Sequence, residues 1–239
     1  MIRVQSPIHA DLAATILTHL DLGKDAASLY QESAPRPSWV RPLEEAYRAS
    51  PQRLRLQFIG LRSDSLASLR GLVQSDALGE AYRVALQAEQ PRVEARREQK
   101  RAKREACLAR ARAELTPRLI PLRAALWGAQ EPPDLTIWHS PAMGQHGRGL
   151  GGRSEQRVLV NLERPVDQAL IQIFHEECHS VSDPAVQAVA ARDTRVGTSG
   201  YQAHARLEQA AVQLGRDVVT RTSPGLLSAY ETFFARYGL

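Results

Sequence analysis

The sequence predicts an α+β fold that is mostly α, and three observations support this prediction. Alanine and arginine, two residues that favour helices, are abundant among the 239 residues. Apolar residues recur at helical spacing in residues 8–20 and in several later segments. Residues 134–140 and 156–162 instead alternate between apolar and polar side chains, as strands do, and residues 2–5 read as a short opening strand.

The first half of the chain is expected to be a helical region. A proline-rich loop at 33–42 follows the opening helix. Residues 63–90 read as two helices, because Ser63 and then Ser75 or Asp76 are suitable N-caps in front of apolar periodic segments.

A long helix over residues 92–115 is expected to end this region. Pro117 and Pro121 follow it directly, and proline disfavours the continuation of a helix. We therefore assign residues 1–115 to a helical N-terminal region and residues 116–239 to a second domain.

The second domain begins with the strand-like segments and continues with helices. The connection between the two segments, residues 141–155, contains five glycines and predicts a hairpin or a mobile loop. Helices are expected at about 166–181 and, after a turn, at 201–221 and at the end of the chain.

Composition excludes several classes of protein. The two cysteines, Cys107 and Cys178, are too few for a disulfide framework or for a zinc site of four cysteines. No stretch has the sustained apolar character of a signal peptide or a transmembrane helix, so we expect a cytoplasmic protein without a membrane partner. The net charge of +5 is concentrated locally and says little about the whole surface.

The segment "IQIFHEECHSV", residues 171–181, carries the main functional signal. His175 and His179 are four residues apart, so on a helix both imidazoles project from one face, one turn apart. This separation lets both rings bind one tetrahedral zinc ion at about 2.0–2.1 Å. Apolar residues on the other side of the same helix indicate that it is packed against a core.

Glu176 is the candidate catalytic base. It is rotated by about 100° from His175 on the helix, which directs its carboxylate to a water on the metal rather than to the metal itself. Zinc lowers the pKa of such a water towards about 7, and a carboxylate beside it can pass its proton to the leaving nitrogen. The motif therefore predicts hydrolysis of a peptide bond.

A catalytic zinc needs a third protein ligand and one open position. Glu208 is the preferred candidate, because it sits at the edge of the apolar stripe of a later helix, where an unpaired carboxylate is costly. His204 is the alternative, as a ligand or as a group beside the ligands. Asp183 is less favoured, because it precedes Pro184 and fits the N-cap of a new helix.

Two further residues are candidates for contact with the substrate. Tyr201 comes just before the Glu208 helix and could stabilise an oxyanion, although packing at the helix start is the simpler interpretation. His146 lies in the glycine-rich connection and could reach the site, although it also fits an ordinary loop histidine.

These motifs resemble those of the gluzincin group of zinc metallopeptidases, and within it the ImmA/IrrE-type peptidases. The likeness rests on His175-Glu176-x-x-His179, on a glutamate, Glu208, 29 residues later, and on the strand "RVLVNL" before the motif, and it covers about half the chain. It implies a zincin-like catalytic domain, zinc ligands His175, His179 and Glu208, and cleavage of an intracellular regulatory protein. Two positions differ: Cys178 stands where the family usually has glycine, and Gly215 where it prefers alanine.

Two other functions stay open at this point. Residues 92–112 hold nine Arg or Lys residues and three Glu, so a zincin-like scaffold without catalysis could bind nucleic acid or a protein partner through this basic helix. Nucleic acid is not favoured, because the helix lacks interleaved aromatic residues and its glutamates can pair with arginines. A zinc hydrolase acting on a non-peptide amide is the other alternative. The leading prediction is a zinc endopeptidase with a protein or peptide substrate.

Overall fold

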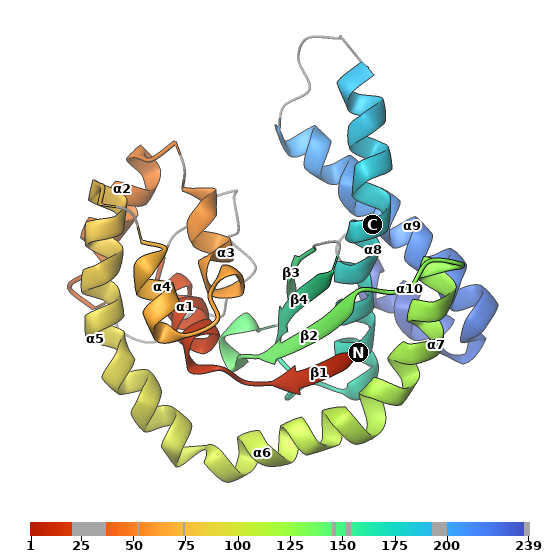
Figure 1. Ribbon diagram of the computed structural model, residues 1–239, viewed down its shortest axis with the longest axis horizontal. Helices are drawn as coiled ribbons and strands as arrows, with labels where there is room; N and C mark the ends of the chain where they lie inside the picture. Colours follow the sequence, from red (N-terminus) through yellow and green to blue (C-terminus); the bar gives the residue numbers. More distant parts are fainter. Residues whose placement is uncertain are drawn as a thin grey trace.

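The computed structural model is mostly helical, with one small mixed sheet of four strands (Figure 1). This confirms the α+β, mostly α, fold class. The structure describes residues 1–20, 37–51, 53–73, 75–144, 147–151, 154–192 and 200–236, without the side chains of 54, 185–192 and 200–204.

The helical lobe contains five helices among the described residues: α1 (Ile8–Leu17), α2 (Val40–Ala49), α3 (Leu54–Arg62), α4 (Leu66–Gly71) and α5 (Ala77–Gln99). It has its own apolar core, which includes the buried rings of Trp39, Tyr47 and Tyr82. Asp76 caps α5 as expected, by accepting a hydrogen bond from the backbone N–H of Gly79. Ser63 does not start a helix; it follows α3, and Ser65 caps α4 instead.

A run of helix carries the chain from the helical lobe to the sheet (Figure 1). It continues from α5 through α6 (Arg101–Arg110), the π-helical turn η2 (Ala111–Leu115) and α7 (Thr116–Trp127). Pro91 and Pro121 lie inside α5 and α7, so neither proline ends its helix. The chain stays helical across residue 116, and the division at this residue stays a prediction.

The sheet has the order β1-β2-β4-β3, built from β1 (Ile2–Gln5), β2 (Asp134–His139), β3 (Gly147–Leu150) and β4 (Glu155–Val160). β1, β2 and β4 are parallel, and only β3 is antiparallel to its neighbour β4. The two strands expected from the sequence are therefore parallel neighbours and do not form a hairpin with each other. β3 lies within the glycine-rich connection and is antiparallel to β4. The chain therefore changes direction twice between β2 and β4.

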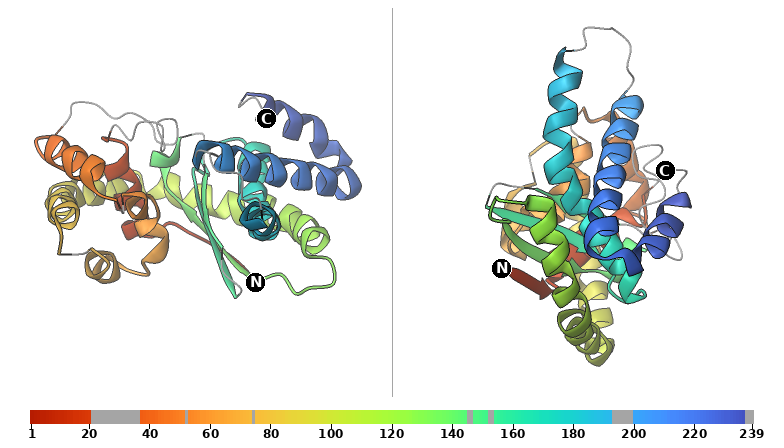
Figure 2. Two further views of the ribbon diagram at one scale, coloured as in Figure 1. Left: turned by 90° about the horizontal axis from the view of Figure 1, so that it is seen from above. Right: turned by 90° about the vertical axis from the view of Figure 1, so that its right-hand side faces the viewer.

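The two faces of the sheet are covered by different parts of the chain (Figure 2). Ile137, Val158 and Val160 point to the main core, which also contains residues from α6 to α10 and the side chain of Val4. Trp138 and Leu159 alternate with them and pack against α1 and α3 of the helical lobe. Because β1 precedes the helical lobe and still joins this sheet, residues from both ends of the chain share the main core.

The sheet and the helices packed with it form the sheet lobe. It includes α8 (Val166–Arg192), α9 (Gly200–Thr222) and α10 (Leu227–Ala235). α8 is longer than expected and continues through Pro184. The prediction of a new helix at Asp183–Pro184 is therefore wrong. A proline removes one hydrogen bond of the helix ladder, and the packing of α8 against α9 outweighs this loss. No helix in the described part of the chain combines the length and the apolar character needed to cross a membrane.

Candidate metal centre

Three side chains of α8 and α9 converge on one point: His175 and His179 from α8 and Glu208 from α9. α8 is fixed in place by its opposite side, where Leu170, Phe174 and Cys178 are buried in the main core. The i, i+4 spacing then directs both imidazoles toward α9. Glu208 reaches the same point from the antiparallel neighbour.

The distances within this cluster fit ligands of a single metal ion. His175 Nε2 lies 3.1 Å from Glu208 Oε2, and His179 Nε2 lies 3.2 Å from His175 Nε2. His179 Nε2 lies 3.5 Å from Glu208 Oε1. Ligand atoms about 2.0–2.1 Å from a tetrahedral zinc ion are separated from one another by about 3.3 Å. Two imidazoles and a carboxylate are also a normal donor set for zinc, so these residues fit the ion.

Asp183 orients one of the histidines. Its Oδ1 lies 2.9 Å from His179 Nδ1, which leaves Nε2 of this ring directed toward the cluster. Asp183 was expected to cap a helix, but it lies within α8, one turn after His179. His175 Nδ1 is buried and has no hydrogen-bond partner among the described residues. The ring of His175 packs instead on Phe234, with 4.8 Å between ring centroids.

The cluster has the electrostatics of a cation site. Burial by itself raises the pKa of Glu208, but hydrogen bonds from His175 and His179 outweigh burial and hold that pKa well below its usual range. Burial lowers the pKa of His179, whereas its hydrogen bonds to Asp183 and Glu208 raise it to a net value of about 10.

Glu176 is held beside this cluster by a neutral partner. Gln172, one turn earlier on α8, donates a hydrogen bond of 2.9 Å from Nε2 to Glu176 Oε1. An amide fixes the orientation of the carboxylate without adding a positive charge. Glu176 therefore keeps the acceptor capacity that a general base needs.

Three glycines allow β3 to lie directly against this side of α8. A Cβ atom at Gly149 would lie 2.9 Å from Glu176 Oε2, which is closer than atoms in contact approach. The same close approach occurs one turn before and one turn after Glu176, for the pairs Gly147–Gln172 and Gly151–Ser180. The glycines follow the period of a strand, and the α8 residues follow the period of a helix. The glycine-rich sequence thus has a packing role at the site.

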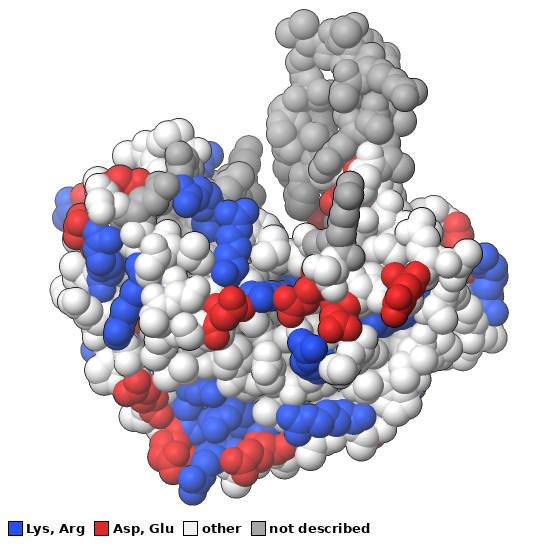
Figure 3. All heavy atoms as spheres, in the orientation of Figure 1, with Lys and Arg blue, Asp and Glu red and all other residues white. Residues whose placement is uncertain are grey.

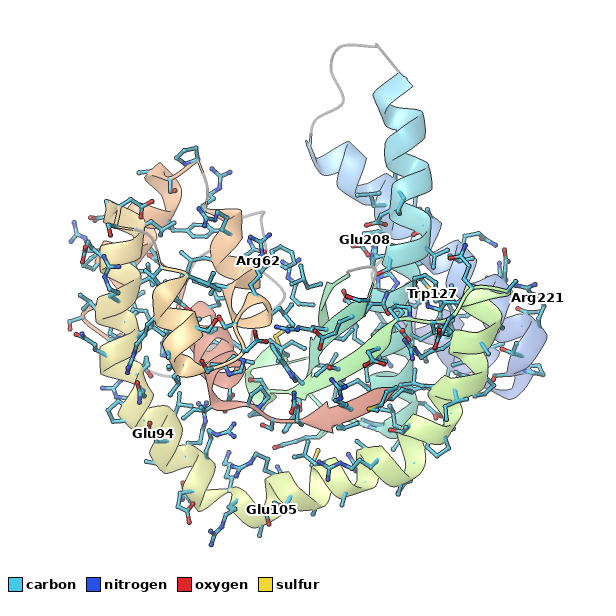
Figure 4. All side chains as sticks on the ribbon, viewed as in Figure 1. Arg62, Glu94, Glu105, Trp127, Glu208 and Arg221 are labelled. Carbon is cyan, nitrogen blue, oxygen red and sulfur yellow. The ribbon has the colours of Figure 1, made fainter. Side chains whose placement is uncertain are left out.

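A cleft of about 830 Å³ opens above Glu176, His179 and Glu208. Trp127 and Glu131, at and after the end of α7, line one side of it. Figure 4 shows Trp127 at the end of α7 and Glu208 on α9. Phe58 of α3 and Arg148 of β3 line the other side. The cleft is large enough for several residues of a peptide, and the helical lobe contributes to its wall.

Some of the predicted site residues cannot be placed. His146 and the side chains of Tyr201 and His204 lie outside the described residues. The structure brings together His175, His179, Glu208 and, beside them, Glu176.

Sequence reasoning missed a buried ion pair behind the site. Glu177 has no exposed side-chain surface, and its Oε1 lies 2.6 Å from Nε of Arg123, whose side chain is 6% exposed. Arg123 also donates a hydrogen bond to the backbone carbonyl of Pro133. Burial raises the pKa of Glu177 to about 7, although Arg123 opposes this shift. Nothing in the local sequence distinguishes Glu177 from Glu176, because the partner is 54 residues away.

Cys178 and Gly215, the two positions that differ from the motifs of the resembled peptidases, lie next to each other in space. A Cβ atom at Gly215 would lie 3.3 Å from Cys178 Sγ and would overlap Tyr230 Oη. The hydroxyl of Tyr230 donates a hydrogen bond of 2.9 Å to the carbonyl of Val212. The larger residue at 178 and the ring of Tyr230 thus occupy the space that a larger residue at 215 would need.

Many basic residues of the helix over 92–112 are bonded within the chain. Arg96 and Arg97 approach the buried carboxylate of Asp11 at 3.5 and 3.3 Å. Backbone carbonyls accept hydrogen bonds from four arginines of this helix: Arg97, Arg104, Arg110 and Arg112. On the outer surface, acidic side chains lie among the basic ones (Figure 3). The positive charge of this helix therefore serves in large part to attach it to the sheet lobe and to α1.

Comparisons of the chain with protein-family models, with curated proteins and with solved structures find no match.

Proposed function

We propose that this protein is a zinc-dependent endopeptidase of the gluzincin type with a zincin-like catalytic domain. His175, His179 and Glu208 are the zinc ligands in this proposal. The observation that carries it is the convergence of their ligand atoms at the separations of tetrahedral coordination. Glu176 beside them supplies the acid–base group that hydrolysis requires.

The protein's own residues have distinct roles in the reaction. When bound, zinc acts as a Lewis acid that polarises the peptide carbonyl and makes water more acidic. Glu176 accepts a proton from the attacking water and delivers it to the leaving amine. Gln172 holds this carboxylate in place, and Asp183 holds the ring of His179.

The shape of the site supports a peptide substrate over a small amide. β3 is at the edge of the sheet and passes directly beside Glu176, so an extended peptide can pair with its free backbone groups. The cleft continues past the cluster in the direction of Phe58 and offers more room than a small amide needs. The resemblance to ImmA/IrrE-type peptidases supports a regulatory protein in the cytoplasm as substrate.

The scaffold without catalysis is the less supported alternative. A scaffold that binds nucleic acid through the basic helix needs free cationic groups, and Arg97, Arg104 and Arg110 are bonded within the chain. A scaffold also has no use for a carboxylate held at the position of Glu176.

The test compares Glu176→Gln with His175→Ala. Glu176→Gln should reduce proteolysis by about 10⁴-fold or more while zinc content and thermal stability stay near those of the parent, because the amide cannot accept a proton. His175→Ala should lose stoichiometric zinc as well, because it removes a ligand. We would measure new peptide termini by mass spectrometry on a whole-proteome peptide digest, and zinc by elemental analysis.

Three results would contradict the proposal. A parent protein that takes up no zinc would remove the metal centre. A zinc-loaded parent that generates no new termini, or a Glu176→Gln variant that cleaves as fast as the parent, would favour the scaffold.

A further inference from the structure

Arg148 stands on the opposite face of β3 from the glycines that contact α8. Because side chains alternate along a strand, Arg148 points toward α3 of the helical lobe. Its guanidinium carbon lies 5.1 Å from the centroid of the Phe58 ring. It also donates a hydrogen bond to Oε1 of Gln57, and Gln57 donates one of 2.9 Å to the hydroxyl of Tyr47. This chain of bonds fixes the position of the guanidinium.

The charge of Arg148 has no carboxylate partner among the described residues. Its Nε is buried and has no hydrogen-bond acceptor. Three other buried or half-buried arginines of the described part have carboxylate partners: Arg123 pairs with Glu177, Arg97 with Asp11, and Arg157 with Asp64 and Glu155. A partly desolvated guanidinium with a free donor is costly, and an anion that enters from the cleft would remove this cost.

The cleft offers one place for such an anion. Among the described residues that line it, Arg148 is the only arginine or lysine. The carboxylates that line the cleft, Glu131, Glu176, Asp183 and Glu208, repel a negative group near them. An acidic group of a bound peptide is therefore stabilised only on the wall formed by β3 and α3.

We propose that Arg148, held by Phe58 and Gln57, forms a subsite that selects an acidic side chain of the substrate. This inference rests on the proposed peptidase function. A peptide paired with the edge of β3 alternates its side chains between the two faces of the sheet. One residue then faces the zinc ligands, and its neighbour faces Arg148. The substrate class is thus a peptide with Asp or Glu beside the scissile bond.

The test uses peptide hydroxamates, which bind a zinc ion directly and need no turnover. Three peptides differ only in the residue adjacent to the hydroxamate: Glu, Gln or Lys. We expect the Glu peptide to bind the zinc-loaded parent about 10- to 100-fold more tightly than the Gln peptide, as for a hydrogen bond between charged groups. Fluorescence competition measures the three affinities.

Variants assign this preference to Arg148. Arg148→Gln should remove the preference for the Glu peptide over the Gln peptide, and Arg148→Glu should make the Lys peptide the tightest ligand. Arg148→Lys keeps the charge and should keep a reduced preference. Arg216→Gln is the matched control, because Arg216 is an exposed arginine of α9 that pairs with Glu231 and does not line the cleft.

The outcomes separate this inference from the function on which it rests. Equal affinity of the parent for the Glu and Gln peptides, or a preference that survives in Arg148→Gln, would overturn the subsite while the zinc site stands. If none of the three hydroxamates binds the zinc-treated parent, the metal site and the subsite both fail. A thermal-unfolding measurement on each variant shows whether lost affinity reflects lost folding.

Discussion

The two sides of α8 carry neighbouring glutamates in opposite surroundings. Glu177 is fully buried on the core side and is held by the guanidinium of Arg123 at 2.6 Å. Glu176 lines the cleft on the other side, and its partner is the neutral amide of Gln172 at 2.9 Å. This difference shows that the surroundings of a glutamate, and not the residue type alone, decide its role. A carboxylate fixed by a buried cation contributes to the fold, whereas one held by an amide beside a cleft can exchange a proton.

The largest expected effect on stability tests the core side of this comparison. Arg123→Ala should lower the free energy of unfolding by about 3–5 kcal/mol, because it leaves the buried carboxylate of Glu177 without its partner. Urea denaturation measures this loss. The control is Arg118→Ala, which breaks the exposed pair of Arg118 with Asp167 and should cost about 0–1 kcal/mol. Equal losses in the two variants would mean that burial of the pair does not matter.

A second variant tests the cleft side. Gly149→Ala places a methyl group 2.9 Å from Glu176 Oε2 and must displace this carboxylate. Because a shift of about 1 Å at a catalytic group can cost about 10²-fold, we expect kcat to fall by about 10- to 100-fold, with zinc content unchanged.

Gly71→Ala is the control for this variant, because Gly71 has open space around its Cβ position and lies in α4, away from the cleft. It should leave kcat unchanged. A Gly149→Ala variant with the kcat of the parent would show that the contact between β3 and Glu176 does not position the base.

The smallest expected effect concerns His139, a buried histidine at the end of β2. His139 is 1% exposed, and its Nδ1 accepts a hydrogen bond from the backbone N–H of Leu162. Burial lowers the pKa of His139 from its ordinary value of 6.5. Below about pH 6.5 the unfolded chain therefore gains a proton that the folded protein does not bind, and stability decreases as the pH falls.

His139→Asn keeps an acceptor near the position of Nδ1 but has no titrating group. The stability of the parent relative to this variant should therefore be constant above about pH 7 and should decrease from pH 6.5 downward. Thermal unfolding at pH 5 to 8 measures this difference. A difference that does not change with pH would mean that His139 binds its proton equally well in the folded and unfolded states.

Features that depend on nearby residues could be predicted from the sequence. The apolar stripe around Phe174 and the i, i+4 spacing of His175 and His179 define a packed helix with two imidazoles on one face. Asp76 is one of the two N-cap candidates, with Ser75, for the same reason, because a cap bonds a backbone N–H three residues away. The wrong prediction at Pro184 also came from nearby residues alone. This proline does not end α8, because contacts with α9 decide the helix length.

The sequence by itself determined that His175 and His179 share one face of α8, that Glu176 follows directly after His175, and that the strands are few. Only the tertiary structure decided that β2 and β4 run parallel, that Glu177 pairs with Arg123, and that Arg148 reaches α3. The physical reason is the range of the interactions. Backbone geometry fixes which side chains share a helix turn or a strand face, whereas contacts between distant segments depend on how complete surfaces fit together.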